Sequence, residues 1–415
     1  MKKVLSILLS VAMIVLCFAA CGKTDGDKSS TGKAANVKVG FIFLHDENST
    51  YDKNFITAAE EACKKAGVEI LKKTNISETQ ACYDAAAELV DEGCNVIFAD
   101  SFGHEPYIIQ AAKKFPEVQF LHATGTKAHT EGLSNYHNAF ASIYEGRYLA
   151  GVAAGMKLNE MISSGKITAD KAKMGYVGAY TYAEVISGYT SFYLGAKSVC
   201  PSVTMEVTFT GSWYDETAEK EAAQKLINNG CVLISQHADS MGAPTACEAA
   251  GVPNVSYNGS TVSACPNTFI VSSRIDWAPY LEYAIDCVKN GKAIDTDWTG
   301  TLSTGSVVLT DVNTKAAAEG TQAKIDEVKA ELEGGKLHVF DTSTFTVTVS
   351  DSKNKNATVD ADGHLTGYKA DIDSDADNTG DTEVVSDGYF HESEKRSAPC
   401  FDVQIDGITL LDTKF

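Results

Sequence analysis

Six short polar segments of this chain combine carboxylates, amides and aromatic rings. HDENSTYDKNF, SFGHEPY, GSWYD, SQHADSMG, YNGS and SSRIDW each follow an apolar run. Aromatic faces stack on flat rings, while carboxylates and amides hydrogen-bond to ring edges and hydroxyls, so these segments predict a binding site for a flat heterocycle. The candidate ligand-binding residues are Asp46, Asp52, Asn54, Phe55, Glu105, Trp213, Asp239, Asn258 and Arg274.

The segments between these loops alternate between short strands and helices. VKVGFIFL (37–44) predicts a strand and residues 52–67 predict a helix, and this unit recurs up to a helix over IYEGRYLAGVAAGMKL. A second series of the same kind starts with KMGYVGAY (173–180). Apolar strands separated by helices indicate parallel sheets covered on both faces. The predicted fold class is therefore α/β with two Rossmann-like lobes, whose ligands bind beyond the carboxyl ends of the strands.

Residues 341–415 differ in composition, with sixteen acidic and six basic residues. Alternating β-branched residues flank Asp362-Gly363, which is typical of a hairpin and predicts an antiparallel β appendage. Asp371, Asp373, Asp375 and Asp377 alternate as in a calcium loop, but Ala376 and Thr382 replace the glycine and glutamate that such a loop needs. We therefore expect a solvated acidic loop and no metal.

The N-terminus predicts export. Lys2 and Lys3 precede an apolar run from Val4 to Ala20, which is short for a membrane span. Small residues before Cys21 make residues 1–20 resemble a bacterial lipoprotein signal, with Cys21 lipid-modified. Residues 21–36 are polar and predict a flexible tether. We expect a lipid-anchored protein on the extracytoplasmic side of the bacterial cell membrane; an ordinary cleaved signal peptide or a single anchor helix is the alternative.

Charge and cysteine usage exclude several classes of protein. A net charge of -20 argues against nucleic-acid binding. Apart from Cys17 and Cys21 there are nine cysteines, an odd number without a C-x-x-C pair, so we expect mostly buried thiols with at most one or two bridges. The sequence contains no P-loop, G-x-S-x-G elbow or H-E-x-x-H motif. We expect no catalysis and no cofactor.

HDENSTYDKNF, GSWYD and the ending DGYFHESEKRSAPCFDVQIDGI together resemble the basic membrane protein family from about Val37 onward. Its members are lipoprotein receptors of ABC importers, and the best-understood ones bind purine nucleosides. The resemblance implies a type I periplasmic-binding-protein fold, with a first lobe of residues 37–155 and 270–297 and a second lobe of residues 156–269 and 298–340. It also implies ligand capture by lobe closure, with an ABC permease as partner. We expect a monomer.

The resemblance also implies roles for individual residues. Phe55 and Trp213 would sandwich the purine base, and Glu105 would contact its edge. Asn54 precedes the stacking aromatic, as in relatives, and Asp239 lies where relatives have glycines. The residues placed near the ribose are Asp46, Asn258 and Arg274.

The sequence also permits alternatives to these residue roles and to the predicted function. The structural alternatives are helix capping for Asp46, Asp52 and Asp239 and a core position for Phe55. For Arg274 the alternative is an ion pair with Asp276 or with a carboxylate of the other lobe. The functional alternatives are a receptor for riboflavin or a free nucleobase, a ligand sensor for a membrane kinase, and a nucleoside-processing enzyme at the cell surface.

Overall fold

A computed structural model of the chain describes residues 36–350, 353–377 and 379–414, and the chain from Asn36 onward forms one compact unit. The predicted signal peptide (1–20), Cys21 and the predicted tether up to residue 35 lie outside the described residues.

The first lobe is built on a six-stranded parallel sheet in the order β11-β5-β4-β3-β1-β2. Helices α2 and α10 pack together in one core cluster, while α3 and α4 bury their apolar residues in a second. Both faces of the sheet are therefore covered, as the apolar strands predict. The elements are β1 (Lys38–Ile42), α2 (Thr50–Ala66), β2 (Glu69–Lys73), α3 (Gln80–Asp91), β3 (Val96–Ala99), η1 (Phe102–His104), α4 (Glu105–Lys114), β4 (Gln119–Ala123), α5 (Ala128–Glu131), β5 (Tyr136–Ala141), α10 (Ala278–Lys289) and β11 (Asp297–Gly300).

The second lobe contains a seven-stranded sheet in the order β12-β10-β9-β8-β6-β7-β18. It is parallel except for β12, which runs antiparallel to β10. The elements are α6 (Ile143–Ser163), η2 (Ala169–Lys171), β6 (Lys173–Gly178), α7 (Ala183–Val199), β7 (Thr204–Phe209), α8 (Glu216–Asn228), β8 (Leu233–His237), α9 (Gly242–Ala250), β9 (Asn254–Tyr257), β10 (Phe269–Ile275), β12 (Val307–Leu309), α11 (Thr321–Glu333) and β18 (Ile408–Leu410).

Helices α6 and α7 of the second lobe pack with their backbones in close contact. A Cβ atom on Gly151 would lie 2.0 Å from the carbonyl oxygen of Phe192, and one on Gly195 would lie 2.0 Å from that of Tyr148. Only glycine permits this approach. It locks α6 onto the second lobe, although the chain enters α6 directly from β5 of the first lobe.

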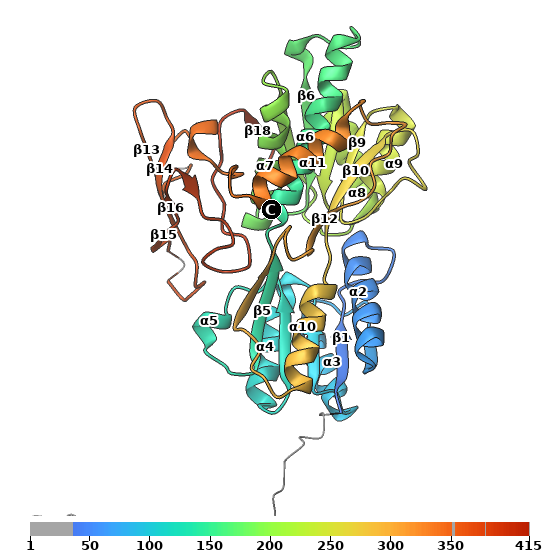
Figure 1. Cartoon of the computed structure of the whole chain (residues 1–415), viewed down its shortest axis with the longest axis vertical. Coiled ribbons are helices and arrows are strands. Elements are labelled where there is room, and N and C mark those ends of the chain that lie inside the picture. The colour runs from blue at the N-terminus through green and yellow to red at the C-terminus, as the bar shows by residue number, and fades with distance from the viewer. Residues whose placement is uncertain (1–35, 351–352, 378, 415) are drawn as a thin grey trace, which may run out of the picture. The chain divides into compact units, whose positions relative to one another are not determined.

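The lobe boundaries differ from the predicted ones. Helix α6 packs against α7, α11 and β10, so the second lobe begins near residue 142 and not at 156. Strand β10, predicted within the first lobe at 270–297, pairs with β9 and β12 of the second sheet, and β11 pairs with β5 of the first sheet (Figure 1). The sequence pattern marks strands and helices but does not determine which sheet completes its hydrogen bonds with a given strand.

Residues 341–414 form the appendage, and most of its strands pair antiparallel, as predicted. Strands β13 (Ala357–Val359), β14 (Leu365–Ala370) and β15 (Thr382–Glu383) form one antiparallel sheet, with Asp362 and Gly363 in the β13–β14 turn. A short 3-10 helix η3 (Thr342–Thr344) precedes this sheet, and β16 (Val385–Ser386) pairs with β17 (Tyr389–Phe390) as a hairpin. The last strand differs from the prediction, because β18 pairs in parallel with β7 and covers an edge of the second sheet.

The nine cysteines from Cys63 to Cys400 are all buried and free. Burial raises the pKa of several of these thiols, and for Cys63 it is the sole cause and raises the pKa to about 12. The prediction of buried thiols is confirmed, and none of these nine residues forms a disulfide.

Candidate functional site

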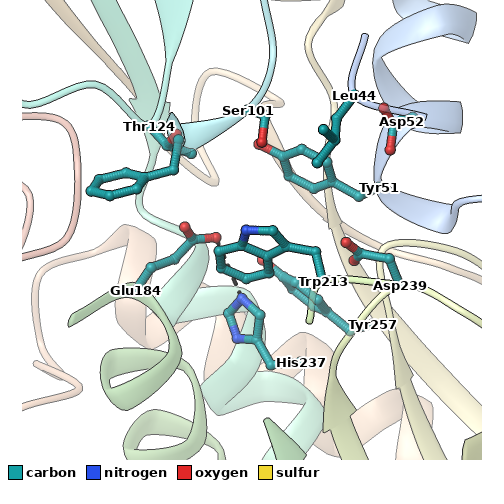
Figure 2. Close-up of a pocket in the computed structure, with 11 residues that line it drawn as sticks. Leu44, Tyr51, Asp52, Ser101, Thr124, Glu184, Trp213, His237, Asp239 and Tyr257 are labelled. Carbon is teal, nitrogen blue, oxygen red and sulfur yellow. Dashed lines mark hydrogen bonds and ion pairs between the residues drawn. The ribbon is translucent and has the colours of Figure 1, made fainter. Parts of the chain in front are cut away.

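A cavity lies between the two lobes, at the carboxyl ends of their strands (Figure 2). Leu44, Ser101 and Thr124 follow strands β1, β3 and β4, while His237 and Tyr257 end strands β8 and β9. The cavity volume is only about 20 Å³, room for about one water molecule, so a small-molecule ligand requires the two lobes to move apart from their position in this structure. The first lobe contributes Leu44, Tyr51, Asp52, Ser101, Phe102 and Thr124, and the second contributes Glu184, Trp213, His237, Asp239 and Tyr257.

The first turn of helix α2 reaches the cavity. Ser49 caps the helix by accepting a hydrogen bond from the backbone N–H of Asp52, and Tyr51 and Asp52 then line the cavity. Phe55, predicted to stack on the ligand, lies one helical turn further from the helix start. Its ring is buried and stacks on Trp277 with a centroid distance of 4.4 Å, so Phe55 belongs to the core of the first lobe. The aromatic residue that α2 presents to the cavity is Tyr51.

Asp52 is buried and held as an acceptor. Its Oδ1 accepts the backbone N–H of His45 at 2.7 Å, and its Oδ2 accepts the Ser49 hydroxyl at 2.6 Å. Burial acts to raise the pKa of Asp52, but the hydrogen bonds from His45 and Ser49 outweigh it and hold this pKa below its usual value. Burial and the neighbouring Asp52 charge raise the pKa of Asp100 well above its usual value.

Asp239 is the buried carboxylate on the second lobe's side of the cavity. Its Oδ1 accepts the side-chain N–H of Asn258 at 3.1 Å, and its backbone N–H donates to the carbonyl of Trp213 at 2.9 Å. Burial, followed by the charges of Asp52 and Glu219, raises the pKa of Asp239 well above its usual value. Asn258, predicted at the ribose, does not line the cavity; it has a left-handed backbone (φ 65°) and orients Asp239.

A hydrogen-bonded chain of four side chains reaches the cavity from the interior of the second lobe. Arg147 donates to the Tyr176 hydroxyl at 3.2 Å, the Tyr176 oxygen lies 3.5 Å from His237 Nδ1, and His237 Nε2 lies 3.4 Å from Glu184 Oε1. Because arginine can only donate, the Tyr176 hydroxyl donates to His237 Nδ1, and Nε2–H then faces Glu184. Burial and the charge of Arg147 lower the pKa of His237 despite Glu184, so the ring is neutral.

Besides Phe55 and Asn258, four further predicted residues do not line the cavity. Asp46 accepts hydrogen bonds from the backbone and side-chain N–H groups of Asn48 and closes a turn before α2. Asn54 is half-buried on α2, beyond the turn that reaches the cavity. Arg274, near the end of β10, lines a separate groove beside β12 and not the cavity. There its guanidinium pairs with Asp276 at 3.4 Å.

Glu105 is the fourth of these residues. It is buried at the start of α4, where Oε1 accepts the backbone N–H groups of Thr126 and Lys127 and the Tyr136 hydroxyl at 2.7–2.9 Å. These donors within the first lobe occupy the carboxylate, so it anchors the loop after β4 and does not face the cavity.

Of the predicted set, Asp52, Trp213 and Asp239 line the cavity. The residues that the sequence analysis did not select include Tyr51, Glu184, His237 and Tyr257. His237 and Tyr257 lie in or beside the quoted segments SQHADSMG and YNGS. Their position at or just after the end of a predicted strand could therefore have identified them as candidates. Glu184 has such a position too, because it follows the predicted strand KMGYVGAY.

The wall of the cavity is acidic and aromatic. Asp52, Glu184 and Asp239 provide carboxyl groups, and no lysine or arginine occurs among the described residues that line it. Buried carboxylates accept N–H and O–H donors and repel anions. Once the lobes separate enough to admit it, this wall suits a flat ligand that is neutral or cationic and carries several hydrogen-bond donors.

Two lobes joined by three chain crossings, with a cavity at the facing strand ends, define a solute-binding protein of the periplasmic type. Residues 41–340 match the Bmp family, described as ABC transporter substrate-binding protein PnrA-like, and the chain belongs to this family. It is 31% identical to a purine-binding protein of Brucella abortus over 73% of this chain and 83% of that protein.

Two further comparisons extend this result. The chain is 26% identical to a protein of Haloferax volcanii, provisionally named an ABC transporter glucose-binding protein, over 78% of each chain. An ABC transporter solute-binding protein from Conexibacter woesei has the same fold, with a TM-score of 0.60, 21% identity and coverage of 73% of this chain and 98% of that one. The predicted fold class and family are confirmed.

Membership of this family makes the protein an extracytoplasmic substrate-binding component of an ABC transporter, with a small-molecule ligand and a membrane permease as partner. None of the helices in the described part of the chain has the length and apolar character of a membrane span.

Proposed function

We propose that this protein captures a purine nucleoside between its two lobes and delivers it to an ABC importer. The observation that carries the proposal is the lining of the cavity, where three carboxyl groups surround the ring of Trp213. The purine would stack on Trp213 and donate its ring N–H groups to carboxylates, which would also accept the ribose hydroxyls. The purine-binding relative supports the same class of ligand.

The acidic cavity wall also limits the charge of the ligand that we expect. A 5′-phosphate would lie among Asp52, Glu184 and Asp239 without a lysine or arginine of the described lining to neutralise it. Nucleosides are therefore expected to bind and nucleotides to be excluded.

A second candidate ligand is a free purine base. One observation favours it: the three residues expected at the ribose, Asp46, Asn258 and Arg274, do not line the cavity. A base would need the stacking ring and the carboxylates but no sugar pocket.

Thermal unfolding with a matched ligand panel tests these proposals. The panel contains inosine, adenosine and guanosine, their free bases, their 5′-monophosphates, and glucose. A ligand at 100 times its Kd stabilises the folded state by about 2.7 kcal/mol, which gives a clear rise in Tm. A rise with nucleosides and none with monophosphates supports the proposal, whereas a rise with bases alone selects the second candidate. A rise with glucose or monophosphates alone contradicts both.

We further propose that Cys21 carries a lipid that anchors the protein to the outer side of the bacterial cell membrane, that the protein acts as a monomer, and that it performs no catalysis. Replacing Cys21 by serine would then release the protein from membranes into the soluble fraction. Membrane retention of the Cys21→Ser variant would contradict lipid anchoring and favour a helical anchor.

A further inference from the structure

Phe102 and Tyr182 are large apolar side chains that remain exposed, at 38% and 40% respectively. Phe102 begins η1 in the first lobe, and Tyr182 is the N-cap residue of α7 in the second lobe. Their ring centroids lie 5.3 Å apart with a tilt of 36°. The two rings therefore form a direct contact between the lobes.

This contact belongs to a continuous row of aromatic rings that leads into the cavity. Tyr182 stacks on Tyr180 with a centroid distance of 5.0 Å, and Tyr180 meets Trp213 edge-on at 5.2 Å. Trp213 and Phe102 both line the cavity, and Phe102 also borders an outer groove between α4 and residues 374–376. The row crosses from one lobe to the other at the pair Phe102 and Tyr182. A separate ring contact between the lobes joins His45 and Tyr214, whose centroids lie 5.4 Å apart.

Glu78 of the first lobe holds the loop that carries Phe102. Glu78 Oε1 accepts the Ser101 hydroxyl at 2.6 Å and the backbone N–H of Gly103 at 2.7 Å. A Cβ atom on Gly103 would lie 2.5 Å from the Glu78 carboxyl carbon, so this approach requires glycine. The chain on both sides of Phe102 is therefore held by bonds within the first lobe.

The two lobes also meet through polar groups at the Asp239 side of the cavity. The backbone N–H and the hydroxyl of Thr50 both donate to the backbone carbonyl of Asp239, at 3.0 and 3.2 Å. In Figure 2, Asp52 and Asp239 lie at one end of the cavity, and Thr124 and Glu184 lie at the other. Tyr182 is two residues before Glu184, so polar bonds close one end and the aromatic pair closes the other.

We propose that Phe102 and Tyr182 form an aromatic gate that controls how fast the bound ligand leaves. Each ring is fixed to a different lobe, so the contact exists only while the lobes are closed, and ligand exit requires it to break. The gate stabilises the closed form relative to the open form, whichever ligand occupies the cavity. This proposal uses the proposed function only in assuming that a small molecule binds in the cavity.

The expected effect is modest because both rings are partly exposed in the closed form. Loss of one aromatic pair corresponds to a two- to tenfold change in an equilibrium constant, to order of magnitude. We expect Tyr182→Ala to release ligand about two- to tenfold faster, with little change in the association rate.

Stopped-flow measurement of Trp fluorescence tests the gate, with inosine as the first probe and adenine as the second. Phe102 lines the cavity but Tyr182 does not, so Tyr182→Ala separates the gate from direct ligand contact. Tyr182→Phe keeps the ring and is expected to release at the wild-type rate. Val262→Ala removes another exposed apolar side chain, 40% exposed and outside the cavity, and serves as the control for surface changes.

A double-mutant cycle shows whether the two rings act as a pair. If they do, Tyr182→Ala accelerates release in the wild-type protein but has no further effect in Phe102→Ala. Equal acceleration in both backgrounds, or acceleration by Tyr182→Phe, would overturn the gate.

A ligand-free measurement separates this proposal from the ligand assignment. Fluorophores introduced at the exposed positions Glu61 in α2 and Glu221 in α8 report the ratio of closed to open molecules by single-molecule energy transfer. We expect Tyr182→Ala to lower this ratio two- to tenfold and Tyr182→Phe to leave it unchanged. If the wild type binds neither probe, the proposed function fails, while an unchanged ratio in Tyr182→Ala rejects the gate.

Discussion

The two lobes use their aromatic residues differently. In the first lobe, Phe55 and Phe98 pack around the buried Trp277. In the second lobe, Trp213 and Tyr257 line the cavity, and Trp213 continues outward to Tyr180. The rings around Trp277 therefore stabilise the first lobe, which presents Tyr51 and Phe102 to the cavity, whereas the second lobe presents Trp213 and Tyr257.

The polar groups show the same asymmetry. The first lobe offers the hydroxyls of Tyr51, Ser101 and Thr124, with Asp52 already hydrogen-bonded by its own helix start. The second lobe offers Glu184 and Asp239, whose loops are set by contacts deep in that lobe. We infer that the second lobe recognises the ligand and that the first lobe completes the enclosure.

The largest expected effect comes from the first lobe's core. Phe55→Ala removes the ring stacked on Trp277 and leaves a cavity, so we expect the free energy of unfolding to fall by about 3–5 kcal/mol. Denaturant unfolding of the ligand-free protein measures this loss, with Phe55→Leu as the milder control. A change below about 1 kcal/mol would show that Phe55 is not a core residue.

Trp213→Ala is expected to have the opposite profile. Affinity for the bound purine should fall about 100-fold, roughly 3 kcal/mol, because the cavity loses its stacking surface. The stability of the ligand-free protein should change by no more than about 1 kcal/mol, since Trp213 is only half-buried. Calorimetric titration measures the affinity, and Trp213→Phe should retain most of it. If Trp213→Ala instead destabilises the fold as much as Phe55→Ala does, the contrast between the lobes fails.

Glu219, in the second lobe, makes the stability of the folded protein depend on pH. Its Oε1 accepts the backbone N–H groups of Ser240 and Asp215, and burial raises its pKa from 4.5 to about 7. A raised pKa means that the folded state holds the proton more tightly than the unfolded state. The stabilisation of the folded state by the proton on Glu219 is complete below about pH 4.5 and is lost as the pH rises through about 7.

Glu219→Gln mimics the protonated side chain and removes this pH dependence. Between pH 4.5 and 8, the stability of the variant relative to wild type should rise by about 3 kcal/mol. Glu221→Gln, at an exposed position on the same helix, is the matched control and should follow the wild-type pH profile. Parallel profiles for wild type and Glu219→Gln in chemical denaturation would contradict the raised pKa.

Arg274→Ala is expected to have the smallest effect. Arg274 is 34% exposed and pairs with Asp276 outside the cavity, so ligand affinity should change less than twofold and stability by no more than about 0.5 kcal/mol. Titration with inosine measures the affinity. A tenfold loss would restore the role that the family resemblance implies and place the ribose near the end of β10.

The sequence predicted the strands and helices of both lobes well because their apolar periodicity reports burial directly. It also predicted the hairpin turn at Asp362-Gly363, since turn chemistry is local. The lobe boundaries were less predictable. Whether β10 pairs with β9 or with a first-lobe strand depends on contacts between residues far apart in the chain, which no local pattern contains.

The candidate site shows the same division. Trp213, Asp52 and Asp239 were identified because polar loops after strands are natural ligand positions. Phe55 and Glu105 have the right chemistry in the right segments, yet one helical turn removes Phe55 from the cavity and three internal donors occupy Glu105.

The sequence by itself determined the class of fold, the family, the strand ends that face the cavity and the acidic, aromatic character of its wall, because these follow from residue types in short segments. Only the tertiary structure decided which of those side chains reach the cavity. The direction of a side chain depends on the helix phase and on its hydrogen-bond partners, and the pairing of Phe102 with Tyr182 requires two lobes to meet. Contacts of this kind arise from packing between distant segments, so they come into existence only with the folded chain.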